Sequence, residues 1–163
     1  MNKEIDYNEH EHDPAKMAML NFDHIVDGIY IGNNFCCQVG LSDKLKEEGI
    51  DIDISLEESH VDNPLGVEAF LWLPTVDGQA PEPHLLTLGA MVLASAVSEG
   101  KKVYVHCQKG HGRSASLVMA YLLSQGHDFD EAFLKIKSAR EDIHLNSTQV
   151  EKLRAYESGL KAS

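Results

Sequence analysis

Cys107 and Arg113 are the residues of this sequence best suited to chemistry on a bound anion. They stand six positions apart. A thiolate is a good nucleophile, and a helix N-terminus or a nearby arginine can lower a thiol pKa from about 8.5 to between about 3.5 and 7.5. The planar guanidinium of an arginine can hold two oxygens of one phosphate group. The residues between the two are Gln108, Lys109, Gly110, His111 and Gly112. The spacing therefore predicts a loop that binds a phosphate ester with the sulfur facing the phosphorus.

The segments on either side of this loop are apolar. Residues 102–106 are predicted to form a short buried strand with Val-Tyr-Val at its centre, and residues 113–125 a central helix rich in Leu, Val, Met and Ala. The N-terminus of a helix attracts anions, and ligands of open α/β sheets bind at the carboxyl ends of strands. Gly110 and Gly112 let the backbone curl so that successive N–H groups point inward. We expect a phosphate-binding loop at this strand-to-helix turn.

The rest of the chain alternates predicted strands and helices. Strands are predicted at residues 29–31, 50–56 and 69–73, and helices at 41–48, 84–99, 128–140 and 147–160. This order predicts an α/β fold with a central, mostly parallel sheet of four to five strands flanked by helices. Ile and Asp alternate within residues 50–56, which predicts a strand with one buried face. We expect residues 1–21 to be a flexible acidic tail and residues 22–160 to form one domain.

Charge and composition exclude several classes of function. The 163 residues include 26 Asp and Glu against 14 Lys and Arg, for a net charge of −12. Such a protein repels nucleic acids and anionic membranes, so we expect neither as a partner. We expect no signal peptide, because residues 1–13 are acidic and contain no apolar run, and no apolar stretch of the sequence is long enough to span a membrane. Three cysteines fit no disulfide framework, which favours a reducing compartment. We expect a cytoplasmic monomer.

The segment from His106 to Ser114 resembles the signature of the protein tyrosine phosphatase superfamily, His-Cys-x5-Arg-Ser/Thr. The chain is short and has no Trp-Pro-Asp triplet, so it is most similar to the small dual-specificity branch. The resemblance implies that residues 22–160 are a catalytic domain. It implies hydrolysis of phosphomonoesters such as protein phosphotyrosine, with phosphoserine and phosphothreonine as further candidates, and leaves the preference among them open. The reaction would pass through a phosphocysteine intermediate and need no metal and no cofactor.

The resemblance also implies a general acid on a mobile loop about thirty residues before the cysteine. Asp77 stands at that distance from Cys107 and is followed by Gly78. An Asp-Gly pair is also common in ordinary turns. Glu82 is the nearest rival for the role of acid.

Three more residues receive roles from the resemblance. Ser114 would stabilise the thiolate as it leaves the phosphoenzyme, and His106 would brace the loop from beneath. Gln149 would position the hydrolytic water. The sequence also allows a different reading of Gln149, because Asn146 and Gln149 have the spacing of a capping box at the start of the last helix.

Other functions remain open at this stage. Lys109 and His111 add positive charge to the loop, as in relatives that act on phosphoinositides or inositol phosphates. A rhodanese-type sulfurtransferase also carries a cysteine in a loop before a helix. A non-catalytic phosphate-binding module would usually lack the cysteine, the arginine or the aspartate, all of which this chain keeps.

Two further groups of residues have suggestive types. Cys36 and Cys37 are adjacent, and we interpret them as small, half-buried structural residues rather than as a partner for Cys107. The run Glu9-His10-Glu11-His12-Asp13 contains metal-ligand residue types. Because it lies in the predicted tail with no matching ligands, we interpret it as a solvated acidic segment and predict no metal site.

Overall fold

A computed structural model describes residues 3–11 and 13–163 of the chain. The strands in these ranges are β1 (Phe22–Val26), β2 (Ile29–Gly32), β3 (Ile52–Ser55), β4 (Ala69–Trp72) and β5 (Val103–His106). The α-helices are α1 (Pro14–Met17), α2 (Asp43–Glu48), α3 (Pro83–Ser98), α4 (Arg113–Ser124), α5 (Phe129–Ala139) and α6 (Ser147–Ala162), and η1 (Asn34–Cys36) is a short 3-10 helix. None of the helices in these ranges is both long and apolar enough to cross a bilayer.

The five strands form one sheet in the order β1-β2-β5-β3-β4. All neighbouring pairs are parallel except β1 and β2, which confirms the predicted mostly parallel sheet. The sequence analysis missed β1. A turn through Asp27 and Gly28, both with positive φ, connects it to β2, and two-residue hairpins need such angles. Because β2, β3, β4 and β5 are parallel, the loops that follow their carboxyl ends gather at one edge of the sheet.

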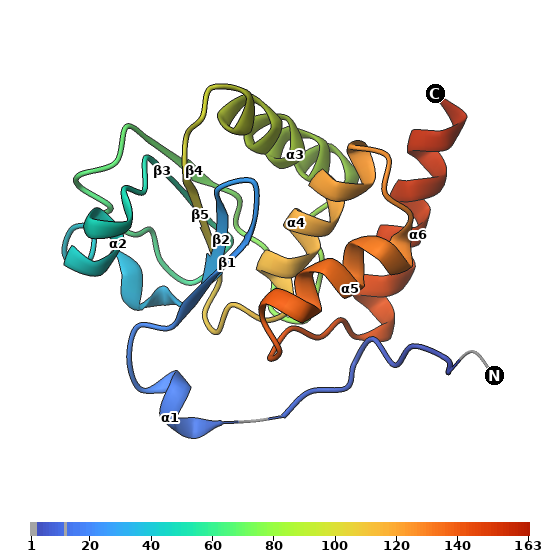
Figure 1. Ribbon diagram of the computed structural model, residues 1–163, viewed down its shortest axis with the longest axis horizontal. Coiled ribbons are helices and arrows are strands. Elements are labelled where there is room, and N and C mark those ends of the chain that lie inside the picture. The colour runs from blue at the N-terminus through green and yellow to red at the C-terminus, as the bar shows by residue number, and fades with distance from the viewer. Residues whose placement is uncertain (1–2, 12) are drawn as a thin grey trace.

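Helices cover both faces of this sheet (Figure 1). Helices α3, α4, α5 and α6 lie on one face, where the larger apolar core forms. Every residue of α4 from Arg113 to Leu123 is buried, so this helix is the centre of the domain, as predicted. A smaller core, which includes Leu41 and Leu45, lies between the other face of the sheet and α2 with η1.

The prediction that β3 has one solvated face is wrong. Asp53 and Ile54 are both 0% exposed, although they point to opposite faces of the sheet. The reason is the position of β3 between β4 and β5, with the smaller core covering the face that carries Asp53. An Ile-Asp alternation normally indicates a half-exposed strand. Because Asp53 is instead buried, its carboxylate needs a partner inside the protein.

The described residues 3–11, expected to be a loose tail, lie against the domain. The ring of Tyr7 packs edge-on against Phe129 and Phe133, with ring centroids 5.3 and 5.1 Å away. The backbone N–H of Leu145 donates to the carbonyl oxygen of Tyr7 at 2.7 Å. This segment passes below α5 and α6 in Figure 1.

Candidate active site

The loop from Cys107 to Gly112 connects β5 to α4, as the sequence predicted. Its tightest point is Gly110, which has a φ of +73°. A side chain at this position would clash with the backbone of Gly32. Only glycine fits, because it adopts positive φ without strain and needs no space for a Cβ.

Arg140, which the sequence analysis missed, holds this loop from outside. Its Nε donates to the carbonyl oxygen of Gly110 at 2.9 Å, and its Nη2 donates to that of Lys109 at 3.3 Å. The C=O and N–H of one peptide unit point in opposite directions. The N–H groups of Gly110 and His111 therefore point away from Arg140 and toward the inside of the loop. Arg140 is 2% exposed and also pairs with Asp23 at 2.7 Å. Nothing in the local sequence indicates this role, because the partners lie about 30 and 117 residues away.

The sulfur of Cys107 lies at the bottom of the loop, where the side chain is 3% exposed. Burial raises the pKa of the thiol, but the Arg113 charge, the Ser114 hydroxyl and the backbone N–H groups of Ser114 and Gly110 outweigh burial and lower that pKa. The Ser114 Oγ is 3.4 Å from the Cys107 Sγ. The structure thus brings Cys107 and Ser114 together, and their surroundings shift the thiol toward its ionised form.

Arg113 is fixed by backbone carbonyls from two other loops. Its Nη1 donates to Thr75 O at 3.0 Å and to Leu56 O at 3.5 Å. Its Nε has no hydrogen-bond partner among the described residues and lies 3.6 Å from the Asp77 Oδ1. The guanidinium is therefore held in orientation by the chain after β3 and β4, while Nε remains available to a ligand.

Asp77 lies at the rim of the same site, with its side chain 79% exposed. It belongs to the loop between β4 and α3 and lines the same cavity as Cys107. Glu82, its rival, instead pairs with Lys152 at 2.8 Å and does not line the cavity that contains Cys107.

The start of α6 anchors the Asp77 loop through three side chains. Asn146 donates to Gly78 O at 2.8 Å, Gln149 donates to Gln79 O at 3.1 Å, and Lys152 donates to Ala80 O at 3.1 Å. The capping box between Asn146 and Gln149 is present. Both ends of the Gln149 amide are therefore occupied by backbone groups, although the residue does line the cavity. Its role in positioning water stays a prediction.

The cavity above Cys107 has a volume of about 210 Å³. Its wall includes three residues that the sequence analysis did not place there, Asn8, His10 and His144. The ring of His10 stacks on that of His144 at 3.7 Å, and His144 lies edge-on to His111 at 5.4 Å. Burial, with the charges of Arg140 and His144, lowers the pKa of His111 to about 4. Burial also lowers the pKa of His144, with smaller effects from neighbouring charges.

The described residues of the run at 9–13 are all exposed, as predicted for a solvated segment, but they also make contacts with the domain. His10 contributes to the active-site wall, and the carbonyl oxygen of Glu9 accepts a bond from Lys137 at 2.7 Å. Asp13 caps α1. His12, which belongs to the same run, lies outside the described residues.

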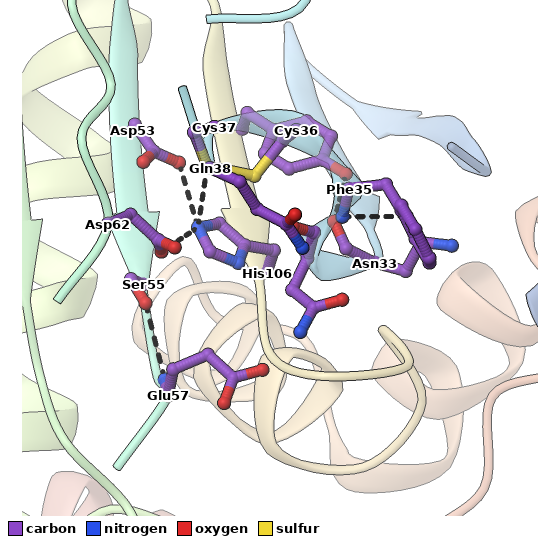
Figure 2. The surroundings of a disulfide bond; sticks show 12 residues. Asn33, Phe35, Cys36, Cys37, Gln38, Asp53, Ser55, Glu57, Asp62 and His106 are labelled. Carbon is purple, nitrogen blue, oxygen red and sulfur yellow. Dashed lines mark hydrogen bonds and ion pairs between the residues drawn. A yellow bond between two sulfur atoms is a disulfide. The ribbon is translucent and has the colours of Figure 1, made fainter. Parts of the chain in front are cut away.

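His106 is buried behind the loop and does not line the cavity. Figure 2 shows its ring between two carboxylates and a disulfide. The Nε2 is 3.2 Å from Asp53 Oδ1, 3.2 Å from Asp62 Oδ2 and 3.5 Å from the Cys37 Sγ. Burial by itself would lower the pKa of His106, but Asp53, and then the charges of Asp62 and Cys107, raise it overall. This position suits a bracing residue rather than one that transfers protons to substrate.

The interpretation of Cys36 and Cys37 as half-buried residues is wrong. Both are fully buried, and their sulfurs form a disulfide with each other. They lie beside His106, while Cys107 is a free thiol. The pair was hard to place because the covering of this face of the sheet by η1 and α2 is a tertiary feature.

Comparison with known proteins agrees with this geometry. The family model for the catalytic domain of dual specificity phosphatases matches residues 7–159. Dual specificity phosphatase 28 of Mus musculus is 30% identical over 151 residues, which cover 91% of each chain. A human phosphatidylglycerophosphatase and protein-tyrosine phosphatase 1 is 38% identical over 101 residues, covering 60% of this chain and 49% of that protein.

The fold is similar as well. A crystal structure of a mouse dual specificity phosphatase complexed with zinc tungstate superposes with a TM-score of 0.76 at 28% identity, covering 86% of this chain and 89% of that one. The matched region includes the loop, the Asp77 segment and most of the N-terminal segment that borders the cavity. The chain therefore belongs to the dual-specificity phosphatase family of cysteine-dependent tyrosine phosphatases.

Proposed function

We propose that this phosphatase acts preferentially on phosphotyrosine in proteins, with Cys107 as its nucleophile. The observation that carries the proposal is the burial of Cys107, 3% exposed, in a cavity whose lining also includes Asn8 and His10. A phosphotyrosine side chain is longer than a phosphoserine side chain and reaches such a sulfur more easily. The stacked rings of His10 and His144 offer a flat wall for an aromatic leaving group.

In the first step, the Cys107 thiolate attacks phosphorus and the bond to the ester oxygen breaks. The guanidinium of Arg113 and the loop N–H groups bind the phosphoryl oxygens and stabilise their charge. Asp77 donates its proton to the departing phenolate oxygen. General acid catalysis of this kind contributes about 10²–10⁴-fold to the rate.

In the second step, water attacks the phosphocysteine and releases inorganic phosphate. Asp77, now ionised, accepts a proton from that water. Ser114 donates a hydrogen bond to the sulfur as it leaves, from its position 3.4 Å away. The loop anchors formed by Asn146 and Gln149 keep Asp77 over the site for both steps.

A phosphoinositide or inositol phosphate is the second candidate substrate. A cavity of about 300 Å³ adjoins the first and shares Gln108, Lys109 and His111 with it. Lys16 and Lys109 line it, but so do Asp13 and Asp142, and Asp142 pairs with Lys16 at 3.4 Å. The two carboxylates offset both lysines, which makes this cavity a poor site for a second phosphate group.

The test compares kcat/KM on one peptide sequence that carries phosphotyrosine, phosphoserine or phosphothreonine, and on phosphoinositide vesicles. We expect phosphotyrosine to exceed the other substrates by at least about tenfold, which corresponds to roughly 1.4 kcal/mol in the barrier. His10→Ala should reduce the ratio of kcat/KM on phosphotyrosine to kcat/KM on the other substrates. Cys107→Ser should abolish turnover of every substrate. Higher activity on phosphoserine or on vesicles would overturn the substrate assignment, and full activity of Cys107→Ser would overturn the mechanism.

A further inference from the structure

A second group of reactive side chains lies on the other side of β5, outside the active-site cavity. It consists of Cys36, Cys37, Asp53 and His106, all of them fully buried, and we refer to it as the buried cluster. One ligand atom from each residue lies within 4.8 Å of the others. The proposed hydrolysis uses none of these side chains directly.

The polar atoms of the buried cluster lack proper partners among the described residues. Apart from contacts with histidine nitrogens at 3.2 Å, the oxygens of Asp53 and of the neighbouring Asp62 make no hydrogen bond, and neither does Nδ1 of His106. The two carboxylates lie within ion-pair distance of the same atom, Nε2 of His106. A single N–H cannot satisfy two carboxylates, and buried charges in proteins are normally paired, hydrogen-bonded or bound to metal.

Two of the six separations between the ligand atoms are close to those of tetrahedral zinc. With ordinary zinc bond lengths, the edges of the tetrahedron are about 3.6 Å between sulfur and nitrogen and about 3.4 Å between nitrogen and oxygen. The observed separations are 3.5 Å from Cys37 Sγ to His106 Nε2 and 3.2 Å from that nitrogen to Asp53 Oδ1. The other three edges that involve a sulfur and a nitrogen or oxygen are each within 4.8 Å. The sixth edge joins the two cysteine sulfurs, which are covalently bonded to each other and must separate first.

We propose that, after reduction of the disulfide, the buried cluster binds one Zn²⁺ through the thiolates of Cys36 and Cys37, Nε2 of His106 and the carboxylate of Asp53. Two cysteines, a histidine and a carboxylate are ordinary zinc ligands. Asp62 is not a ligand in this arrangement and keeps its contact with His60, at 3.2 Å. The disulfide and the metal are mutually exclusive, so the cluster holds zinc only in its reduced form.

The conversion of the buried cluster from its disulfide form to its zinc-bound form is balanced in electrons and protons. An external dithiol supplies two electrons and two protons to the Cys36–Cys37 bond, giving two thiols and an oxidised dithiol. Zinc binding then releases both thiol protons to solvent, together with any proton on His106 Nε2. The remaining His106 proton is on Nδ1, so the metal also fixes the tautomer of the residue that precedes Cys107.

The experiment uses the full chain, reduced with a water-soluble phosphine, desalted without oxygen and titrated with Co²⁺ as a spectroscopic substitute for zinc. We expect thiolate-to-cobalt charge-transfer absorption and the visible bands of tetrahedral Co²⁺, both displaced by one equivalent of Zn²⁺. Native mass spectrometry should find one zinc per reduced chain and none in the oxidised chain.

Matched variants locate the metal. The double variant Cys36→Ser with Cys37→Ser should lose the charge-transfer band, and Asp53→Asn, which keeps the side-chain size, should weaken zinc binding at least about tenfold. Cys107→Ser should bind zinc as the unmodified chain does, since its sulfur faces the other cavity. If the double variant fails to fold, as judged by circular dichroism, then Asp53→Asn and the oxidised chain decide the matter.

Two results would overturn the zinc site. One is a reduced chain without cobalt bands or stoichiometric zinc. The other is a band that disappears in Cys107→Ser but persists in the double variant, which would place the metal on the catalytic thiolate. Because the readouts are spectra and metal content, they remain independent of whether the substrate assignment holds.

Discussion

Replacing Arg140 with methionine tests whether this buried arginine shapes the phosphate-binding loop. Methionine fills much of the same volume but leaves the carbonyl oxygens of Lys109 and Gly110 without the donors found at 3.3 and 2.9 Å. A buried acceptor left without a partner costs about 1–3 kcal/mol. Asp23 is partly exposed and is hydrated when its partner is removed, so loss of the ion pair adds little to the destabilisation. We expect the free energy of unfolding to fall by about 2–5 kcal/mol, out of the roughly 5–15 kcal/mol typical of a domain.

A kinetic assay on folded protein distinguishes the effect of Arg140→Met on the shape of the loop from its effect on stability. In protein shown to be folded by urea titration, Arg140→Met should lower kcat/KM on p-nitrophenyl phosphate by about 10–100-fold, because each factor of ten is about 1.4 kcal/mol of transition-state binding. Inorganic phosphate should become a weaker competitive inhibitor by a similar factor. Asp23→Asn is the matched control, since it removes the ion pair but keeps both bonds to the loop, and it should stay within about threefold of the unmodified chain.

Unchanged kinetics and phosphate inhibition in folded Arg140→Met would refute the reasoning. Equal damage from Asp23→Asn would refute it as well, because the ion pair and not the two carbonyl bonds would then be the important contact.

Three further predictions concern the acid, the histidine wall and the N-terminal segment. Asp77→Asn should lower turnover of phenyl phosphate by about 10²–10⁴-fold and affect esters with acidic leaving groups much less; an equal loss on both would contradict the role of acid. His111 has a pKa of about 4 when folded and about 6.5 when unfolded, so the unfolded chain binds more protons between these values. The free energy of unfolding should therefore decrease by about 1–2 kcal/mol, after screening by solvent, as the pH falls from 6.5 to 4. Urea titrations at several pH values measure this decrease, and His111→Gln should lose part of it. A His111→Gln variant that retains the whole decrease would contradict the assignment. Tyr7→Ala removes the ring that packs on Phe129 and Phe133 and should destabilise the chain by about 1–3 kcal/mol and open residues 3–11 to proteolysis, with Glu4→Ala as a neutral control.

Local chemistry was sufficient to predict the loop and the elements that carry it. The pattern is contiguous: Cys107, two glycines and Arg113 stand between an apolar strand and an apolar helix. The shape of the loop backbone therefore depends on residues only a few positions apart. The capping box at Asn146 and Gln149 was predictable for the same reason, and it is present. The mostly parallel sheet followed from the alternation of strands with helices.

What surrounds the loop was decided by contacts between distant segments. Arg140 reaches the loop from the end of α5, His10 reaches the cavity from a segment that looked like a solvated tail, and Gln149 binds the Asp77 loop through its amide. Periodicity and spacing describe neighbours along the chain, whereas these positions depend on how helices pack across the sheet.

The buried cluster shows the difference between the two levels most clearly. Cys36 and Cys37, Asp53 and His106 come from three separate stretches of sequence, and the alternation around Asp53 indicated a solvated face. By itself, the sequence determined the type of reaction, because a nucleophile and its oxyanion-binding loop are encoded within seven consecutive residues. Only the tertiary structure decided which residues support that loop, because burial on both faces of a central strand is a property of the packed sheet.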